Sequence, residues 1–136
     1  MSALSAAAVG DRVVHKQFPP ITRHTLALYC GASGDHNPIH VDLDFAKQAG
    51  FPDVFSHGML VMGYLGQALT DAVAPSRIRS FSTRFAAITQ LGAVLTCEGR
   101  VSELIEHDGE KRAKLALTVK DQHGEVKLAG EAIVAL

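Results

Sequence analysis

The sequence lacks the features that mark several large classes of protein. It has two cysteines in 136 residues, Cys30 and Cys97, far apart and without a CxxC pair. This spacing fits two reduced, buried thiols better than a disulfide framework or a zinc site. No apolar run reaches the roughly 18 to 20 residues that a membrane-spanning helix needs. We therefore expect no association with a membrane.

Charge of one sign is also scarce. The chain has 13 Lys and Arg against 14 Asp and Glu, a formal net charge of -1, which gives no general attraction to nucleic-acid phosphates. Aromatic and basic residues do not interleave as a nucleic-acid surface requires, so we expect no such partner. The apolar start of the chain has no basic residue ahead of it, unlike a secretory signal, and we expect a cytoplasmic protein.

The composition that remains is that of a soluble globular protein. Hydrophobic residues make up 47% of the chain and charged residues 20%. The length suits one core, and no repeat, linker or low-complexity segment divides the chain. We expect a single domain over residues 1–136.

The first half predicts three helices. Thr22 is a suitable N-cap for a short helix that ends near Gly31 and Gly34, with three residues on one face: Leu26, Tyr29 and Cys30. Asp42 is a suitable N-cap for a second helix that ends at Gly50, with three residues expected inward: Phe45, Ala46 and Ala49. The third helix, residues 57–73, is apolar on more than one stripe, so we expect protein to wrap most of it.

The second half predicts strands. After Pro75, apolar and polar residues alternate over residues 80–88, 93–107, 111–124 and 125–136, and a further strand is expected near residues 12–18. Glycine-containing turns at residues 107–111 and 121–125 are typical of hairpins. We predict an α+β fold, an antiparallel sheet of five or more strands around one apolar helix.

The stretch GASGDHNPIHVD, residues 31–42, concentrates the polar residues of the first half. Pro38 fixes its own φ and pushes Asn37 out of the helical region, so residues 35–40 are expected to form a tight loop. Asp35 and Asn37 can accept hydrogen bonds from the backbone of that loop. A turn over Pro38 could bring the Asp35 carboxylate and the His40 imidazole within reach of one water molecule, as an acid/base pair.

Gly58 lies at the expected start of the long helix. Unpaired N–H groups and the positive end of the helix dipole point outward there, and an enolate-like oxygen would suit that position. The alternative is a small residue at a crowded helix start.

Two segments together resemble one known family. YCGASGDHNPIHVDLDFA, residues 29–46, resembles the S-G-D-x-N-P-x-H signature of the MaoC-like, R-specific enoyl-CoA hydratases (hydratase 2). SHGML, residues 56–60, resembles the H-G-M segment of the same family. The resemblance implies a hot-dog fold, an antiparallel β-sheet wrapped around a long central α-helix. It also implies pairing with a second hot dog, as a homodimer or a heterodimer, through the sheet edge.

The resemblance further implies a hydro-lyase that needs no cofactor. Such an enzyme interconverts trans-2-enoyl and (R)-3-hydroxyacyl thioesters of coenzyme A or acyl carrier protein. By position, Asp35 and His40 match the catalytic pair, Gly58 the oxyanion-binding N–H and Asn37 the residue that supports the loop. We also expect substrate contacts from Asn37 and from three further residues: His57, Met59 and Arg84.

Arg84 belongs to a cluster with Arg77 and Arg79 that could meet the phosphates of coenzyme A or an acidic carrier protein. A solvated sheet edge is the alternative, since Arg77 and Arg79 would face the same way on any strand. The sequence after Arg84-Phe85, AAITQLGA, departs from the Pro-Val and Pro-Gly-Asp pattern that many members have there, so the contacts of that loop do not carry over.

A metal site is not expected. His36 and His40 with Asp35 and Asp42 offer suitable ligand types, but no cysteine or third histidine lies at ligand spacing. His36 is expected to face outward.

Three other functions remain open. A hot-dog thioesterase would act on the same substrate class, but such enzymes do not depend on a D-x-N-P-x-H turn. A non-catalytic subunit of a two-chain 3-hydroxyacyl-ACP dehydratase would be expected to lack Asp35 or His40, so the chain could instead be the catalytic subunit. A plain ligand-binding hot dog is the third.

Overall fold

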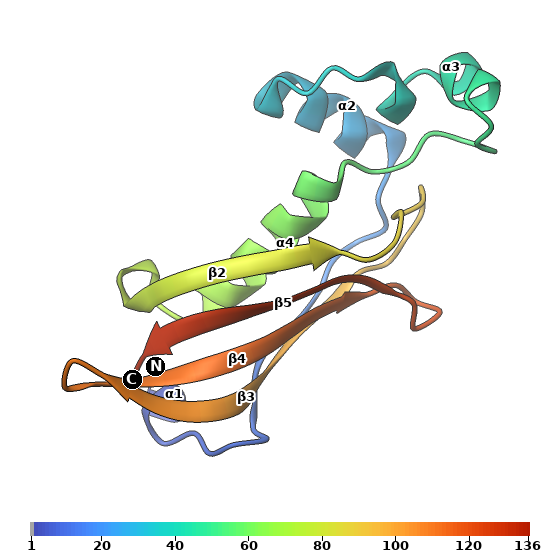
Figure 1. The fold of residues 1–136 in the computed structure, drawn as a ribbon. Helices are drawn as coiled ribbons and strands as arrows, with labels where there is room; N and C mark the ends of the chain where they lie inside the picture. Colours follow the sequence, from blue (N-terminus) through green and yellow to red (C-terminus); the bar gives the residue numbers. More distant parts are fainter. Residues whose placement is uncertain (1) are drawn as a thin grey trace.

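Five antiparallel strands form one sheet (Figure 1). The computed structural model describes the backbone of residues 2–136 and the side chains from residue 4 onward. The strands lie in the order β1-β3-β4-β5-β2, so β1 and β2 are the edges. The predicted sheet is confirmed, with these bounds: β1 Arg12–Gln17, β2 Ile78–Phe85, β3 Thr96–His107, β4 Glu110–Lys120 and β5 Val126–Ala135.

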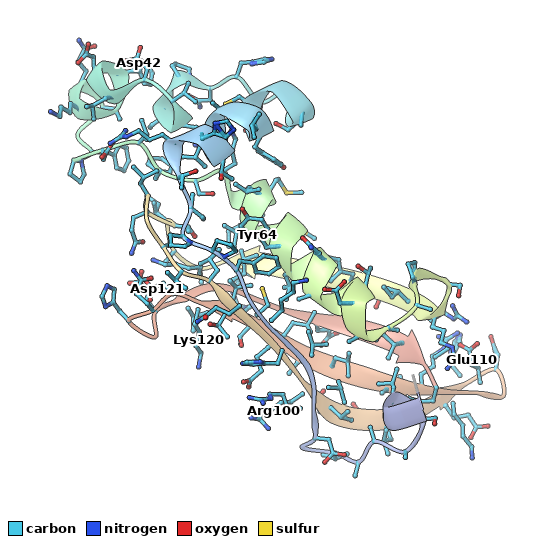
Figure 2. The ribbon with its side chains drawn as sticks, turned by 180° about the vertical axis from the view of Figure 1, so that it is seen from behind. Asp42, Tyr64, Arg100, Glu110, Lys120 and Asp121 are labelled. Carbon is cyan, nitrogen blue, oxygen red and sulfur yellow. The ribbon has the colours of Figure 1, made fainter. Side chains whose placement is uncertain are left out.

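The β3–β4 hairpin shows how local sequence sets the strand register. Asp108 and Gly109, the two residues between the strands, have φ values of 50° and 79°, as a two-residue type I′ turn requires. The predicted turns at 107–111 and 121–125 both join neighbouring strands. They lie at opposite ends of the sheet, as the labelled Glu110 and Asp121 show (Figure 2).

The long helix α4, Gly58–Ala72, packs across one face of the sheet (Figure 1). Its buried side chains are Leu60, Val61, Leu65, Ala68 and Leu69, and they share one core with buried residues of β3, β4 and β5. Burying a Leu or Val side chain contributes roughly 1.5–3 kcal/mol, so this face holds the helix on the sheet. An antiparallel sheet around one long helix is the α+β hot-dog fold that the resemblance implied, and that prediction is confirmed.

Two helices, α2 (Arg23–Ser33) and α3 (Leu43–Gln48), lie together beyond the N-terminal end of α4 (Figure 1). Both N-caps are as predicted. The Thr22 hydroxyl accepts a hydrogen bond from the N–H of Thr25 at 3.1 Å. The Asp42 carboxylate accepts from the N–H groups of the first turn of α3. Asp42 marks the far tip of this helical unit (Figure 2).

The two helices differ from the prediction in detail. Helix α2 continues through Gly31 and ends at Gly34, whose φ of 77° is left-handed, because glycine is tolerated within a helix when its φ stays negative. In α3, Ala46 is buried but Phe45 and Ala49 are exposed. A helix of fewer than two turns presents only a narrow face to its neighbours, so the inward placement of Phe45 and Ala49 was wrong.

The short elements were not predicted. They are α1 (Ser2–Ser5), η1 (Pro38–His40) and η2 (Pro75–Arg77), each a single turn without detectable apolar periodicity. Arg77 therefore lies in η2, not on a strand beside Arg79, which pairs with Glu110 across the sheet at 2.9 Å. Within residues 2–136, no helix combines the length and apolarity needed to cross a membrane.

Edge strand β2 lies very close to β5, and every second side chain of β2 points toward α4. A Cβ on Gly130 of β5 would lie 2.2 Å from the main-chain oxygen of Ser82, so glycine is needed at this approach. The Thr83 hydroxyl donates to the sulfur of Met62 on α4 at 3.3 Å. Because side chains alternate along a strand, Phe85 points toward α4 and Arg84 points to the opposite face.

A buried lysine fixes the loop that follows β2. Lys127 is 1% exposed, and its ammonium donates to the main-chain oxygen of Ile88 at 2.8 Å and to the side-chain oxygen of Gln90 at 2.9 Å. The carboxylates of Glu125 and Asp121 also pair with it. A buried charge is stable only when it is paired in this way, so the network holds the loop against β5.

Candidate active site

Asp35 lies in a loop whose side chains accept hydrogen bonds from the backbone of the same loop. One carboxylate oxygen, Oδ1, accepts a hydrogen bond from the N–H of Asn37 at 3.2 Å, and the Asn37 side chain accepts from the N–H of Ile39 at 3.1 Å. Asn37 has φ -56° and ψ 121°, outside the helical region, directly before Pro38. The predicted tight loop and the supporting place of Asn37 in it are confirmed. The second oxygen of Asp35, Oδ2, is left to face His40.

His40 has one ring nitrogen engaged and one free. Its Nδ1 lies 2.8 Å from the main-chain oxygen of Phe55. A carbonyl oxygen can only accept, so Nδ1 carries the proton, and in the neutral ring Nε2 is an acceptor. The residue is buried, 8% exposed, so the ring is held in one orientation.

The Asp35 carboxylate and the His40 imidazole face each other across a short gap. His40 Nε2 and Asp35 Oδ2 are 4.0 Å apart, and the Asp35 side chain is 51% exposed. A deprotonated carboxylate and an unprotonated nitrogen are both acceptors, so they do not bond directly. A single water about 2.8 Å from each atom would donate one of its two hydrogens to each of them. The turn over Pro38 thus places the two groups within reach of one water, as predicted.

His57 packs directly on this pair. Its ring stacks on the His40 ring, with centroids 3.7 Å apart and planes inclined by 25°. Its Nε2 lies 3.4 Å from the main-chain oxygen of Asp35 and 3.4 Å from the sulfur of Cys30, and Tyr29 meets it edge-on. Burial, followed by the proximity of His40, lowers the pKa of His57, so the ring is neutral at pH 7.

Gly58 begins α4 immediately after His57. The N–H groups of a first helical turn have no partner within the helix. A Cβ on residue 58 would lie 2.9 Å from the Phe85 ring, so the helix start is crowded as well as polar. Gly58 therefore lies at a helix start, where N–H groups lack a partner within the helix, and at a crowded position that suits a small residue.

A cavity of about 330 Å³ opens beside this helix start. Its wall is largely apolar and includes Gly58 and Phe85, together with other residues of α4, of β5 and of the loop after β2: Val61, Ala86, Ala87, Ile88, Thr89 and Leu128. Phe55 also lines it, and the His40 ring meets the Phe55 ring edge-on at 5.5 Å. Phe55 therefore contacts both the cavity and the His40 ring.

Three potential metal ligands meet here. The ligand atoms of Asp35, His40 and His57 lie within 4.8 Å of one another. However, the two histidine rings are stacked nearly parallel, and a lone pair lies in the plane of its ring, so their lone pairs do not converge on one ion. This arrangement suits a stacked pair better than a metal centre.

The other predicted residues do not face the gap between Asp35 and His40. Met59 is exposed on the first turn of α4, and His36 is exposed as predicted. Arg84 lies on the sheet face opposite Phe85 and lines a separate, polar hollow with Glu131. Substrate binding by Met59 and by Arg84 stays a prediction. The position of Arg84 on the opposite sheet face does not favour its predicted contact with substrate. His57 is 1% exposed, which speaks against its predicted contact with substrate.

Comparison with known proteins decides the family. The profile described as MaoC like domain matches residues 5–123. The chain belongs to the MaoC-like domain family.

Relatives of this MaoC-like chain carry hydratase names. It is 32% identical over 116 residues to the (R)-specific enoyl-CoA hydratase of Rhodospirillum rubrum, covering 84% of the chain and 78% of that protein. It is 36% identical over 80 residues to the peroxisomal enoyl-CoA hydratase 2 of Arabidopsis thaliana, covering 57% of the chain. The chain spans only 26% of the length of the Arabidopsis protein and of the Mycobacterium tuberculosis enoyl-CoA hydratase ChsH3.

A solved structure supports the same placement. The R-hydratase PhaJ1 of Pseudomonas aeruginosa superposes on the MaoC-like chain with a TM-score of 0.83 at 28% identity. The match covers 96% of the chain and 83% of that structure.

Three contributors to the site were not predicted. The Phe55 carbonyl that fixes His40 has no sequence signature, because any residue offers a carbonyl. The other two are the approach of Phe85 to Gly58 and the contact of Cys30 with His57. These contacts join segments far apart in the chain, and no spacing rule reports them. The one available signal was that Cys30 lies on the apolar face of its helix.

The low pKa of His57 makes stability depend on pH. In the unfolded chain this histidine titrates near its ordinary value of about 6.5, and in the folded chain it titrates lower. Below pH 6.5 the unfolded state therefore binds more protons than the folded state. The free energy of unfolding should fall as the pH drops from 6.5 toward the folded pKa, and it should be insensitive to this group above 6.5.

Urea unfolding between pH 5 and 8, compared for the unmodified protein and His57→Phe, isolates this contribution. We expect the two stability curves to be parallel above pH 7 and the unmodified protein to lose more stability below 6.5. Equal losses in both proteins would show that His57 titrates normally in the folded state.

Proposed function

We propose that this chain adds water across the double bond of trans-2-enoyl thioesters to give (R)-3-hydroxyacyl thioesters, and catalyses the reverse dehydration. The observation that carries the proposal is the 4.0 Å gap between His40 Nε2 and Asp35 Oδ2. Two acceptors at this spacing suit a single water, which has two hydrogens to donate. The lone pairs of the water oxygen then point away from the protein, toward an electrophile.

The chemistry follows from that water. Its oxygen attacks C3 of the enoyl group while one proton passes to the pair of Asp35 and His40. A proton returns from the pair to C2, so both parts of one water add to the double bond and nothing else is consumed. His40 can act as the base because its Nδ1 is engaged with the Phe55 carbonyl and its Nε2 is left as an acceptor.

The negative charge that builds up on the thioester oxygen needs a donor. Gly58 at the start of α4 borders the cavity, and an N–H at a helix N-terminus combines a free donor with the positive end of the dipole. The apolar wall formed by Val61, Phe85 and Leu128 suits an acyl chain.

The named relatives support the reaction class. The Rhodospirillum rubrum protein is named an (R)-specific enoyl-CoA hydratase, and a 3-hydroxybutyryl-CoA dehydratase of Methylorubrum extorquens is 34% identical over 104 residues. We therefore favour coenzyme A thioesters over carrier-protein thioesters. The cytoplasmic location stays a prediction.

A second hot-dog chain also stays a prediction. Strand β2 is an edge of the sheet, and exposed apolar side chains lie at its end, on the loop that follows it and on α4: Phe85, Ile88 and Met59. An unpaired edge flanked by apolar side chains favours pairing with another chain.

The proposal separates hydration from thioester hydrolysis. We expect incubation with crotonyl-CoA to remove the conjugated enoyl absorbance without release of free thiol, because water attacks C3 and the thioester stays intact. A thiol reagent and the enoyl absorbance are followed together. Butyryl-CoA, which lacks the double bond, is the control and should remain unchanged. Release of coenzyme A at the rate at which the enoyl signal disappears would favour a thioesterase.

The acid/base pair is tested by Asp35→Asn and His40→Gln. Each should lower kcat by about 10²- to 10⁴-fold with little change in KM, because neither substitution removes the contacts proposed for the thioester. Asparagine keeps an oxygen that can accept from the Asn37 N–H, so the loop should persist. If the two groups share one water, the double variant should be scarcely slower than the slower single variant.

His36→Gln is the matched control for these variants. This neighbour is exposed, and we expect its rate to stay within a few-fold of the unmodified protein. A folded Asp35→Asn protein with near-native hydration activity would mean that other groups activate the water.

A further inference from the structure

We infer that His57 is a positioning residue whose buried ring aligns Asp35 and His40 with each other, an inference that rests on the proposed function. It replaces the expectation that His57 touches substrate. His57 is 1% exposed, and its contacts are with other side chains and with the loop.

His57 contacts both members of the pair. Its ring face covers the His40 ring at a centroid distance of 3.7 Å. Its Nε2 lies 3.4 Å from the main-chain oxygen of Asp35, and because that oxygen can only accept, Nε2 carries the proton. The stack fixes the plane of the His40 ring, and the hydrogen bond that His57 donates fixes the distance of the Asp35 backbone from that ring. One side chain thus contacts both sides of the 4.0 Å gap between Nε2 of His40 and Oδ2 of Asp35.

His57 also links the pair to the helix start. It is the N-cap residue of α4, directly before Gly58. A displacement of His57 would therefore move the proposed oxyanion donor and the water-activating pair together. Tyr29, edge-on at 4.7 Å, and Cys30, 3.4 Å from Nε2, hold the ring from the α2 side.

Packing alone does not favour histidine at this position. Nδ1 of His57 is buried and has no hydrogen-bond partner among the described residues. A buried polar atom without a partner is destabilising, and a hydrocarbon ring of similar shape would avoid that cost. An imidazole that the fold does not need is expected where function depends on it.

Two variants separate the ring from the hydrogen bond. His57→Phe keeps a stacking ring and loses the donor to Asp35, whereas His57→Gln keeps a donor in a similar place and loses the ring. We expect each to lower kcat for crotonyl-CoA by roughly 10- to 100-fold with KM within about three-fold, the effect of a small misplacement of reacting groups. His36→Phe, the same change at the exposed neighbour, should leave kcat within about two-fold.

Thermal unfolding distinguishes positioning from a structural role. At pH 7.5 we expect the Tm of His57→Phe to be unchanged or up to about 5 °C higher, because the unpartnered nitrogen is removed. Lower activity in a protein of equal or greater stability supports positioning. A His57→Phe protein that does not fold, or whose kcat falls only as its Tm falls, would overturn the inference, and so would native kcat in both variants.

A spectroscopic readout keeps this test independent of turnover. Long-range ¹H–¹⁵N correlation spectra should show His40 protonated at Nδ1 and His57 at Nε2. His57→Gln should broaden or shift the His40 signals, because its ring is no longer held. If the unmodified protein does not hydrate crotonyl-CoA but the His40 signals change in this way, the proposed function fails and the positioning stands. If the unmodified protein is active and the His40 signals are unchanged in His57→Gln, only the positioning fails.

Discussion

The site depends on one hydrogen bond, from His40 Nδ1 to the main-chain oxygen of Phe55. That bond decides which nitrogen of the ring is free, and only a free Nε2 can face Asp35 as an acceptor. The Phe55 segment is itself held by the loop after β2, through a bridge to Gln90 and a bond from the Ser56 N–H to Thr89. Lys127 fixes this loop from beneath. A buried ion network in the sheet and the orientation of a histidine in the helical unit are therefore parts of one connected structure.

The hot-dog architecture explains why these parts meet. Helix α4 lies across the sheet and its N-terminus emerges beside the last residue of β2, where Gly58 leaves room for the Phe85 ring. The two short helices α2 and α3 lie beyond this end of α4 (Figure 1), and the loop between them brings Asp35 and His40 to it. The first N–H groups of the helix, the apolar cavity and the two titratable side chains thus lie around the same end of α4. A rigid sheet and helix position a site built largely from loop residues.

Local features of the sequence predicted much of this. The caps at Thr22 and Asp42, the turn at Asp108-Gly109 and the loop over Pro38 follow from the conformations that those residue types prefer, and all were found. Contacts between distant segments could not be predicted in the same way. The stack of His57 on His40 and the burial of Lys127 depend on how the chain returns to itself, so His57 was assigned to substrate and Lys127 was overlooked. The inward placement of Phe45 and Ala49 was wrong, because an apolar residue is buried only where a second layer of the structure covers it.

The central claim is that Asp35 and His40 act together on one water from one side of the enoyl double bond. Hydration of trans-crotonyl-CoA in D₂O tests it directly, because the new C–O and C–D bonds then come from the same water on the same face. The relative configuration at C2 and C3 of the 2-deuterio-3-hydroxybutyryl product is measured from its proton coupling constants. We predict syn addition, with deuterium at C2 on the face that carries the hydroxyl at C3. Anti addition would require a proton donor on the opposite face and would contradict a single shared water.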